Sequence, residues 1–110
     1  MSIGEPSKLL RIHIGEQDVF DGKPLYEAIV AKCQETGIAG ATVIPGIEGY
    51  GDSPPGGGHP LHEERPVLIS IVDTAENLAL LVPEVEQMIG KGLIAMSDVK
   101  VIRVEKSRRK

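Results

Sequence analysis

The chain has 110 residues, 41% of them hydrophobic and 25% charged, and a formal net charge of −4 at pH 7. This predicts one domain over residues 1–110 and argues against a disordered tail protein. The acidic balance and the 3% aromatic content argue against a nucleic-acid partner. The single cysteine excludes an intramolecular disulfide. No signal peptide and no membrane-spanning apolar run is recognisable, which predicts a soluble, cytoplasmic protein.

The first predicted strand covers residues 8–14, where aliphatic side chains alternate between two faces. One face holds Leu10, Ile12 and Ile14, and the other holds Leu9, Arg11 and His13. A polar turn follows over residues 15–23. Pro24 then suits the first position of a helix, and apolar residues recur along one side of it at Leu25, Ile29 and Cys33. Thr36-Gly37 is expected to end this helix.

A second strand is predicted over residues 41–44, with a bend or bulge at Pro45-Gly46. Residues 49–65 read as a loop because a run of proline and glycine cannot hold a helix or a strand interior. Loops of this length in a small domain are usually functional or disordered. A third strand is predicted over residues 66–72.

The second helix is predicted to begin at a capping box formed by Asp73 and Glu76, and its apolar stripe extends from Leu78 to Ile89. Pro83 interrupts this pattern and is expected to kink or split the helix. Gly90-Lys91-Gly92 ends the element. The last strand is predicted near residues 99–104, and residues 106–110 form a basic tail.

This order predicts an α+β fold of the ferredoxin-like βαββαβ type, with an ordered core of about residues 8–104. Two helices cover one face of a four-stranded antiparallel sheet, and a long loop is inserted between the middle strands. The other face mixes apolar and polar side chains, among them Leu9, Arg11, His13, Thr42 and Ser70. Because sheet faces with several aliphatic residues tend to be covered, an oligomer is expected.

Two motifs resemble the PII signal-transduction superfamily: residues 37–43, Gly-Ile-Ala-Gly-Ala-Thr-Val, and residues 49–51, Gly-Tyr-Gly. Residues 9–16, 22–29 and 69–74 are similar to the PII-like family of small bacterial and archaeal proteins of unknown function. The likeness covers residues 8–104, and the motifs occur in the family's order. The resemblance implies a homotrimer whose three sheets face inward.

The resemblance further implies a regulatory protein rather than an enzyme, with no required cofactor. Members of the superfamily bind small effectors, often adenine nucleotides, in clefts between subunits. Binding reorders a long loop, the T-loop, which here corresponds to residues 50–65. The T-loop docks on a target protein, and for this family the target expected is a membrane transporter or channel.

The ligand-binding residues are carried over one motif at a time. The resemblance places Thr42 beside the nucleotide base and Gly49-Tyr50-Gly51 at the base of the T-loop, where glycine lets backbone amides approach the ligand. Gly90-Lys91-Gly92 resembles the B-loop, whose glycines form a backbone anion nest. Arg103 matches an arginine of the last strand that reaches phosphate from the neighbouring subunit.

Three positions depart from the PII pattern. Lys91 replaces an aspartate of the B-loop, Leu93 replaces its lysine, and Glu105 stands near an expected arginine. Fewer cations argue against tight binding of ATP. AMP, ADP or a cyclic nucleotide therefore fits the chain better, with ATP a further possible effector.

The alternative is a metal-binding protein or metal-dependent enzyme that uses His59 and His62, next to two glutamates of the same loop. An acylphosphatase is disfavoured because residues 15–18 are acidic where a phosphate cradle needs a cation. An RNA-recognition domain is excluded because residues 67–71 carry no aromatic side chain. Cys33 is expected in the core, without a base to activate it.

Overall fold

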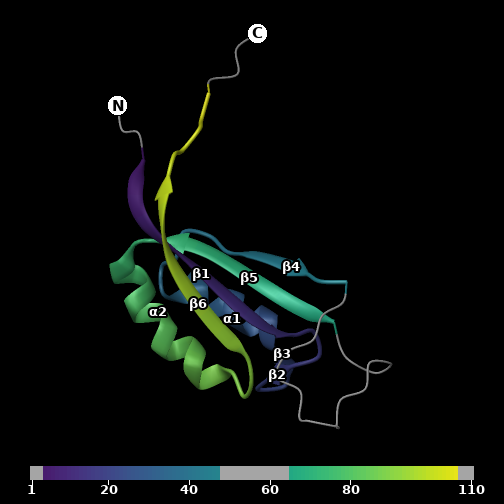
Figure 1. Ribbon diagram of the computed structural model, residues 1–110. Coiled ribbons are helices and arrows are strands. Elements are labelled where there is room, and N and C mark those ends of the chain that lie inside the picture. Colours follow the sequence, from purple (N-terminus) through teal and green to yellow (C-terminus); the bar gives the residue numbers. More distant parts are fainter. Residues whose placement is uncertain (1–3, 48–64, 107–110) are drawn as a thin grey trace.

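Four strands form one antiparallel sheet in the order β4-β5-β1-β6, in a computed structural model that describes residues 4–47 and 65–106 (Figure 1). The strands are β1 (Glu5–Gly15), β4 (Thr42–Pro45), β5 (Pro66–Asp73) and β6 (Leu93–Val101). The helices are α1 (Leu25–Glu35) and α2 (Ala75–Met88). This is the predicted ferredoxin-like arrangement, and the prediction is confirmed.

Both helices pack on one face of the sheet and enclose a single apolar core. Even-numbered residues of β1 and odd-numbered residues of β5 point into it, because strand side chains alternate between faces. The largest fully buried side chains are Leu10, Ile12, Leu25, Ile29, Ile69, Ile71, Leu78, Leu81 and Val85. The two apolar stripes read from the helical sequences are therefore the surfaces that cover the sheet.

The end of α1 is a Schellman motif. Gly37, with φ +83°, follows the last turn, and its N–H donates to the carbonyl of Gln34 at 3.3 Å. The N–H of Ile38 donates to the carbonyl of Cys33 at 2.9 Å, and the Ile38 side chain enters the core. Glycine suits this left-handed position, which confirms the predicted end of the helix.

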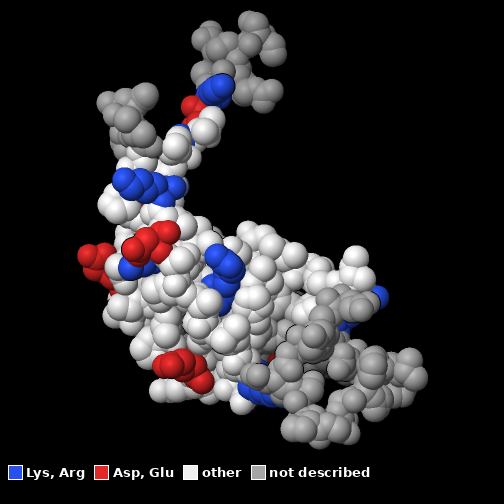
Figure 2. All heavy atoms as spheres, in the orientation of Figure 1, with Lys and Arg blue, Asp and Glu red and all other residues white. Residues whose placement is uncertain are grey.

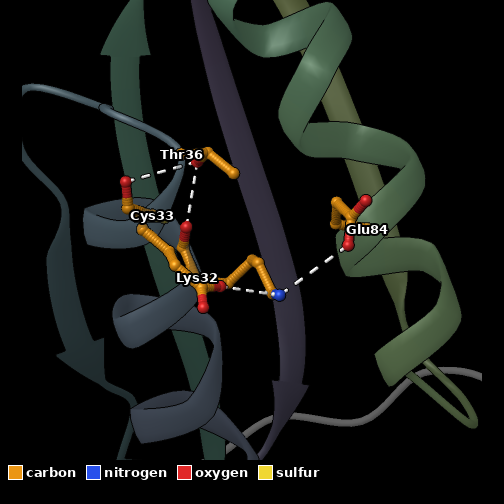
Figure 3. Close-up of polar contacts among 5 residues, drawn as sticks. Lys32, Cys33, Thr36 and Glu84 are labelled. Carbon is orange, nitrogen blue, oxygen red and sulfur yellow. Dashed lines mark hydrogen bonds and ion pairs between the residues drawn. The ribbon is translucent and has the colours of Figure 1, made fainter.

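The C-terminal end of α1 is linked to α2 by an ion pair of Lys32 (Figure 3). Lys32 Nζ lies 2.8 Å from Glu35 Oε1 on its own helix and 3.7 Å from Glu84 Oε1 on α2. The hydrogen bond with Glu35 and the charge of Glu35 raise the pKa of Lys32. The Thr36 hydroxyl donates to the carbonyl of Lys32 at 2.9 Å and closes the last turn.

The start of α2 differs from the predicted capping box by one residue. Thr74 is the N-cap, and its hydroxyl accepts a hydrogen bond from the Asn77 N–H at 3.1 Å. The predicted pair, Asp73 and Glu76, is wrong because Asp73 is the last residue of β5. Pro83 lies inside α2 without splitting it, so one continuous helix runs from Ala75 to Met88.

The last strand is six residues longer at its start than predicted and ends earlier, at Val101. Residues 93–98 lack a clear polar–apolar alternation because β6 is an edge strand, exposed along most of its length. Pairing with β1 makes it a strand, from His13↔Leu93 to Glu5↔Val101. Strand β1 begins at Glu5, three residues before its predicted start. Its pairing with β5 ends at Lys8, opposite Asp73, so residues 5–7 are paired with β6 alone.

A small hairpin occupies the segment predicted as a polar turn. Its strands are β2 (Val19–Phe20) and β3 (Lys23–Pro24), joined by Asp21 with φ 56° and Gly22 with φ 80°. Two consecutive positive φ values define the tight turn that suits the twist of a two-residue hairpin. The N–H of Leu25 donates to the Asp18 carbonyl at 2.8 Å, which joins this hairpin to the start of α1.

The sheet face opposite the helices has no layer packed on it among the described residues, and we call it the open face. The strand register assigns it the following residues: Glu5, Ser7, Leu9, Arg11, His13, Thr42, Ile44, Leu68, Ser70, Val72, Leu93, Ala95, Ser97, Val99 and Val101. Figure 1 views the sheet from this side, with α1 behind it. Within the described residues no helix has the length and apolar character needed to cross a membrane.

Candidate functional site

Thr42 is the first residue of β4 and its side chain is exposed. It lies directly opposite Ser70 of β5 on the open face. The segment before it is held by three local interactions: the Schellman motif at Gly37, the buried side chain of Ile38 and a hydrogen bond from the Ala39 N–H to Asp73 at 3.1 Å. The glycine-containing motif of residues 37–43 therefore has a structural role, because its first residues fix the position of Thr42.

Asp73 is the residue that anchors this run. Its carboxylate accepts hydrogen bonds from the N–H of Ala39, the N–H of Thr74 at 2.7 Å and the Asn77 amide at 2.7 Å. Burial raises the pKa of Asp73, but these hydrogen bonds lower it by more, so the pKa lies below its usual value. An ionised Asp73 thus joins the end of β5, the start of α2 and the segment that leads into β4.

The loop of residues 90–92 crosses from the end of α2 to the start of β6 and lies close to β1. A Cβ atom on Gly92 would sit 2.7 Å from the His13 carbonyl oxygen and 3.2 Å from a side-chain carbon of Ile14. A Cβ atom on Gly90 would meet nothing within 4 Å. Gly92 is therefore required by backbone packing, whereas Gly90 is sterically free.

Lys91 is the charged group of this loop. It is exposed, and among the described residues no ion pair holds its ammonium group. Neither flanking glycine has a positive φ. Since a backbone anion nest needs alternating right- and left-handed residues, the loop is not in a preformed nest conformation. The ammonium group of Lys91 is what the loop offers to an anion.

Arg103 lies beyond the end of β6, at the opposite end of the strand from the loop of residues 90–92. Its side chain is 76% exposed, and Nε lies 3.8 Å from Glu5 Oε1 at the start of β1. Figure 1 shows that this part of the chain projects away from the sheet beside the N-terminal end of β1. The sequence alone did not identify Glu5 as the partner of Arg103. The two residues meet only because β1 and β6 pair in this register, which the sequence pattern does not reveal.

The candidate residues do not converge within one chain. Thr42 lies on one edge strand of the sheet and Lys91 borders the other edge strand. Since neighbouring strands are about 4.8 Å apart, the edges are separated by roughly 14 Å across the sheet. Arg103 lies at the far end of β6. A ligand that contacts all three residues therefore needs more than one copy of the chain.

Five candidate residues, Gly49, Tyr50, Gly51, His59 and His62, lie outside the described residues. Over residues 4–47 and 65–106, no group of three or more histidine, cysteine, aspartate or glutamate side chains is placed to hold a metal ion. Cys33 is 2% exposed, and burial raises the pKa of its thiol to about 11. The thiol is therefore protonated at neutral pH and is a poor nucleophile.

The sequence profile of the DUF190 family, described as "Uncharacterized ACR, COG1993", matches residues 7–101. The chain is 39% identical over 100 residues to a UPF0166 protein of Aquifex aeolicus, a match that covers 86% of this chain and 92% of the relative. It is 35% identical over 107 residues to a UPF0166 protein of Methanocaldococcus jannaschii, with 90% and 94% covered.

Among solved structures, the fold is similar to that of CPII, a nitrogen regulatory PII-like protein from Thiomonas intermedia K12, in a structure bound to ADP, AMP and bicarbonate. The TM-score is 0.65, the identity is 18%, and the likeness covers 87% of this chain and 94% of CPII. At this identity the likeness establishes the fold and leaves the ligand to be argued from the residues of this chain.

Proposed function

Since the chain belongs to the DUF190 family, whose profile it matches over residues 7–101, we propose that it is a PII-like regulatory protein. It assembles as a homotrimer and binds an adenine nucleotide, AMP or ADP, in the clefts between copies. The bound nucleotide changes the conformation of residues 50–65, which contact a partner protein, such as a membrane transporter or channel. It acts as a switch and not as an enzyme.

The observation that carries this proposal is the separation of the candidate residues within one chain. Thr42 and Lys91 lie at opposite edges of the same sheet, so one copy cannot hold a small ligand between them. Two copies placed side by side bring the β4 edge of one next to the β6 edge of the other. A cleft between copies thus unites residues that the fold keeps apart.

The open face supports the oligomeric part of the proposal. Leu93 is 58% exposed and Ile44 is 45% exposed, and both lie on this face beside partly buried Leu9 and Leu68. Aliphatic side chains gathered on one sheet face gain free energy when another layer covers them. Copies of the same chain supply that layer when their sheets face one another.

The chemistry of the cleft favours a nucleotide with little charge. The Thr42 hydroxyl can donate to or accept from a purine edge, and Lys91 and Arg103 are the cations offered to phosphate. Since Arg103 already pairs with Glu5, part of its charge is neutralised. Two cations, one of them paired, suit a monophosphate or diphosphate better than a triphosphate. CPII, of similar fold, is bound to ADP and AMP.

Calorimetric titration of AMP, ADP and ATP into the purified protein tests the proposal. We expect one site per copy, with tighter binding of AMP or ADP than of ATP. Thr42→Ala and Lys91→Gln are each expected to weaken binding by about tenfold, since each removes one ligand contact. Lys23→Gln, a change of an exposed lysine on the β2–β3 hairpin, is the matched control and is expected to leave affinity unchanged.

Limited proteolysis with and without the nucleotide then tests the switch. If the ligand orders residues 50–65, cleavage in this segment slows at saturating nucleotide, because ligand contacts favour one of its conformations. Binding without any change in cleavage there would reject the switch and keep the nucleotide site. No binding of any adenine nucleotide would reject the proposed function.

A further inference from the structure

The open face contains one polar row between two mainly apolar rows. The strand register places Thr42, Ser70, Arg11 and Ala95 side by side on β4, β5, β1 and β6. The row on one side consists of Val72, Leu9 and Ser97, and the row on the other side consists of Ile44, Leu68, His13 and Leu93. Directly opposite residues in a sheet have Cβ atoms about 5 Å apart, so the side chains of Ser70 and Arg11 leave the sheet side by side.

Among the residues that the structure describes, none places a carboxylate near Arg11 on this face. None of the residues in the three rows is acidic, and no ion pair joins Arg11 to another described residue. Asp98 pairs with Lys8, whose side chain points to the helix side of β1, and Glu5 pairs with Arg103. In Figure 2, which shows the open face, the acidic atoms in view lie toward the margins rather than over the middle of the sheet.

Covering the open face changes the energetics of Arg11. This step rests on the proposed function, in which copies of the chain bring their open faces together. Arg11 then leaves water, and the one carboxylate that the strand register assigns to the described part of this face, Glu5, lies six residues away along β1 and already pairs with Arg103. A buried cation without a partner is strongly destabilising, whereas a cation that holds an anion through charge-assisted hydrogen bonds is tolerated. The assembly therefore needs an anion at this point.

We propose that Arg11 and Ser70 form an anion site on the inner face of the assembled protein, and that its ligand is a small oxyanion such as inorganic phosphate. The planar guanidinium group binds two oxygens of such an ion at once, and the Ser70 hydroxyl donates to a third. The site lies on the two inner strands, β5 and β1, whereas the proposed nucleotide cleft uses residues of the edge strands, of which Thr42 is the neighbour of Ser70. Its occupant neutralises Arg11 and stabilises the packing of the copies.

Thermal unfolding in buffer of fixed chloride concentration, with increasing inorganic phosphate, tests the site. We expect phosphate to raise the melting temperature of the wild-type assembly in a saturable way. Arg11→Gln is expected to weaken the phosphate response by about tenfold or more, and Ser70→Ala by about threefold. Lys100→Gln makes the same charge change on a side chain outside the three rows, and it is expected to keep the wild-type response.

Light scattering and nucleotide titration on the same samples separate this proposal from the proposed function. A single-copy mass would reject the assembly on which both depend. A trimer whose melting temperature does not respond to phosphate, or an Arg11→Gln trimer that responds like the wild type, would reject the anion site alone. A loss of nucleotide affinity in Arg11→Gln would also reject it, because Arg11 would then belong to the cleft. If Arg11→Gln does not assemble, Arg11→Lys keeps the charge without the two-pronged geometry and is expected to weaken the phosphate response severalfold.

Discussion

At the scale of single residues, the glycines on either side of Lys91 make different demands on the fold. Gly92 lies so close to the His13 carbonyl that a methyl group there would force the backbone of β1 or of the loop to move. Gly90 has open space around it. We expect Gly92→Ala to lower the free energy of unfolding by about 1–3 kcal/mol, a cost typical of inserting one carbon into a tightly packed site.

Urea unfolding measures this difference, with Gly90→Ala as the matched control. Gly90→Ala is expected to change stability by less than about 0.5 kcal/mol, as surface substitutions usually do. Equal stability of the two variants would contradict the close approach of residues 90–92 to β1. Glycine at position 92 would then be explained by ligand binding rather than by packing.

Cys33 gives a second prediction at this scale. Because burial raises the pKa of its thiol to about 11, the thiolate is scarce at neutral pH and a reagent cannot reach the sulfur. We expect the folded protein to react with an aromatic disulfide reagent only as fast as it unfolds. The denatured protein is expected to react within the mixing time. Rapid labelling of the folded protein would contradict the burial of the Cys33 side chain between α1 and the rest of the core.

The sequence predicted which face of the sheet carries the polar residues, but it did not predict which side chains pair with one another. It placed Arg11 and His13 on the face away from the helices, and the strand register confirms this. It did not find the pair of Arg103 with Glu5, because that contact depends on the register of β1 against β6 over the whole chain. The roles proposed for Thr42, Lys91 and Arg103 in ligand binding stay predictions.

At the scale of elements, Asp73 links a strand, a helix and the segment before β4. Its pKa is lowered in the folded protein, so the ionised carboxylate stabilises the fold above the ordinary carboxyl pKa of about 3.9. This stabilisation is lost as the pH falls through the lower pKa of the folded state. We expect Asp73→Asn to lower the free energy of unfolding by about 1 kcal/mol at pH 7.

The pH dependence distinguishes this role from a simple loss of packing. Between pH 5 and pH 2 the wild type is expected to lose stability more steeply than Asp73→Asn, so the two curves converge in acid. Denaturant unfolding at several pH values measures both curves. Curves that stay parallel over this range would contradict the role of the ionised carboxylate.

The helices were predictable because each carries one apolar stripe and clear end signals, such as Gly37 after α1. The strand β6 was not, because an exposed edge strand has little alternation to reveal it and owes its conformation to pairing with β1. The β2–β3 hairpin was missed since each of its strands has only two residues. Pro83 was expected to disturb α2, but the helix continues through it, with Leu81 and Val85 on either side fully buried in the core.

At the scale of the whole molecule, the fold distributes its candidate ligand groups over both edges and one end of the sheet. This distribution follows from the strand order β4-β5-β1-β6, which the predicted ferredoxin-like fold implies and which composition or periodicity alone does not give. The uncovered aliphatic face was predictable from alternation alone. Together the two features lead to the central claim that the functional unit consists of several copies and that its ligand lies between them.

Native mass spectrometry of the purified protein with ADP tests this claim most directly, because one spectrum reports both the number of copies and the number of bound nucleotides. We predict an assembly of three copies of the 11.8 kDa chain that carries up to three ADP molecules. The Thr42→Ala variant is predicted to give the same three-copy assembly with fewer nucleotides. A single copy as the main species, or a trimer that never carries ADP or AMP, would contradict a nucleotide site formed between three copies.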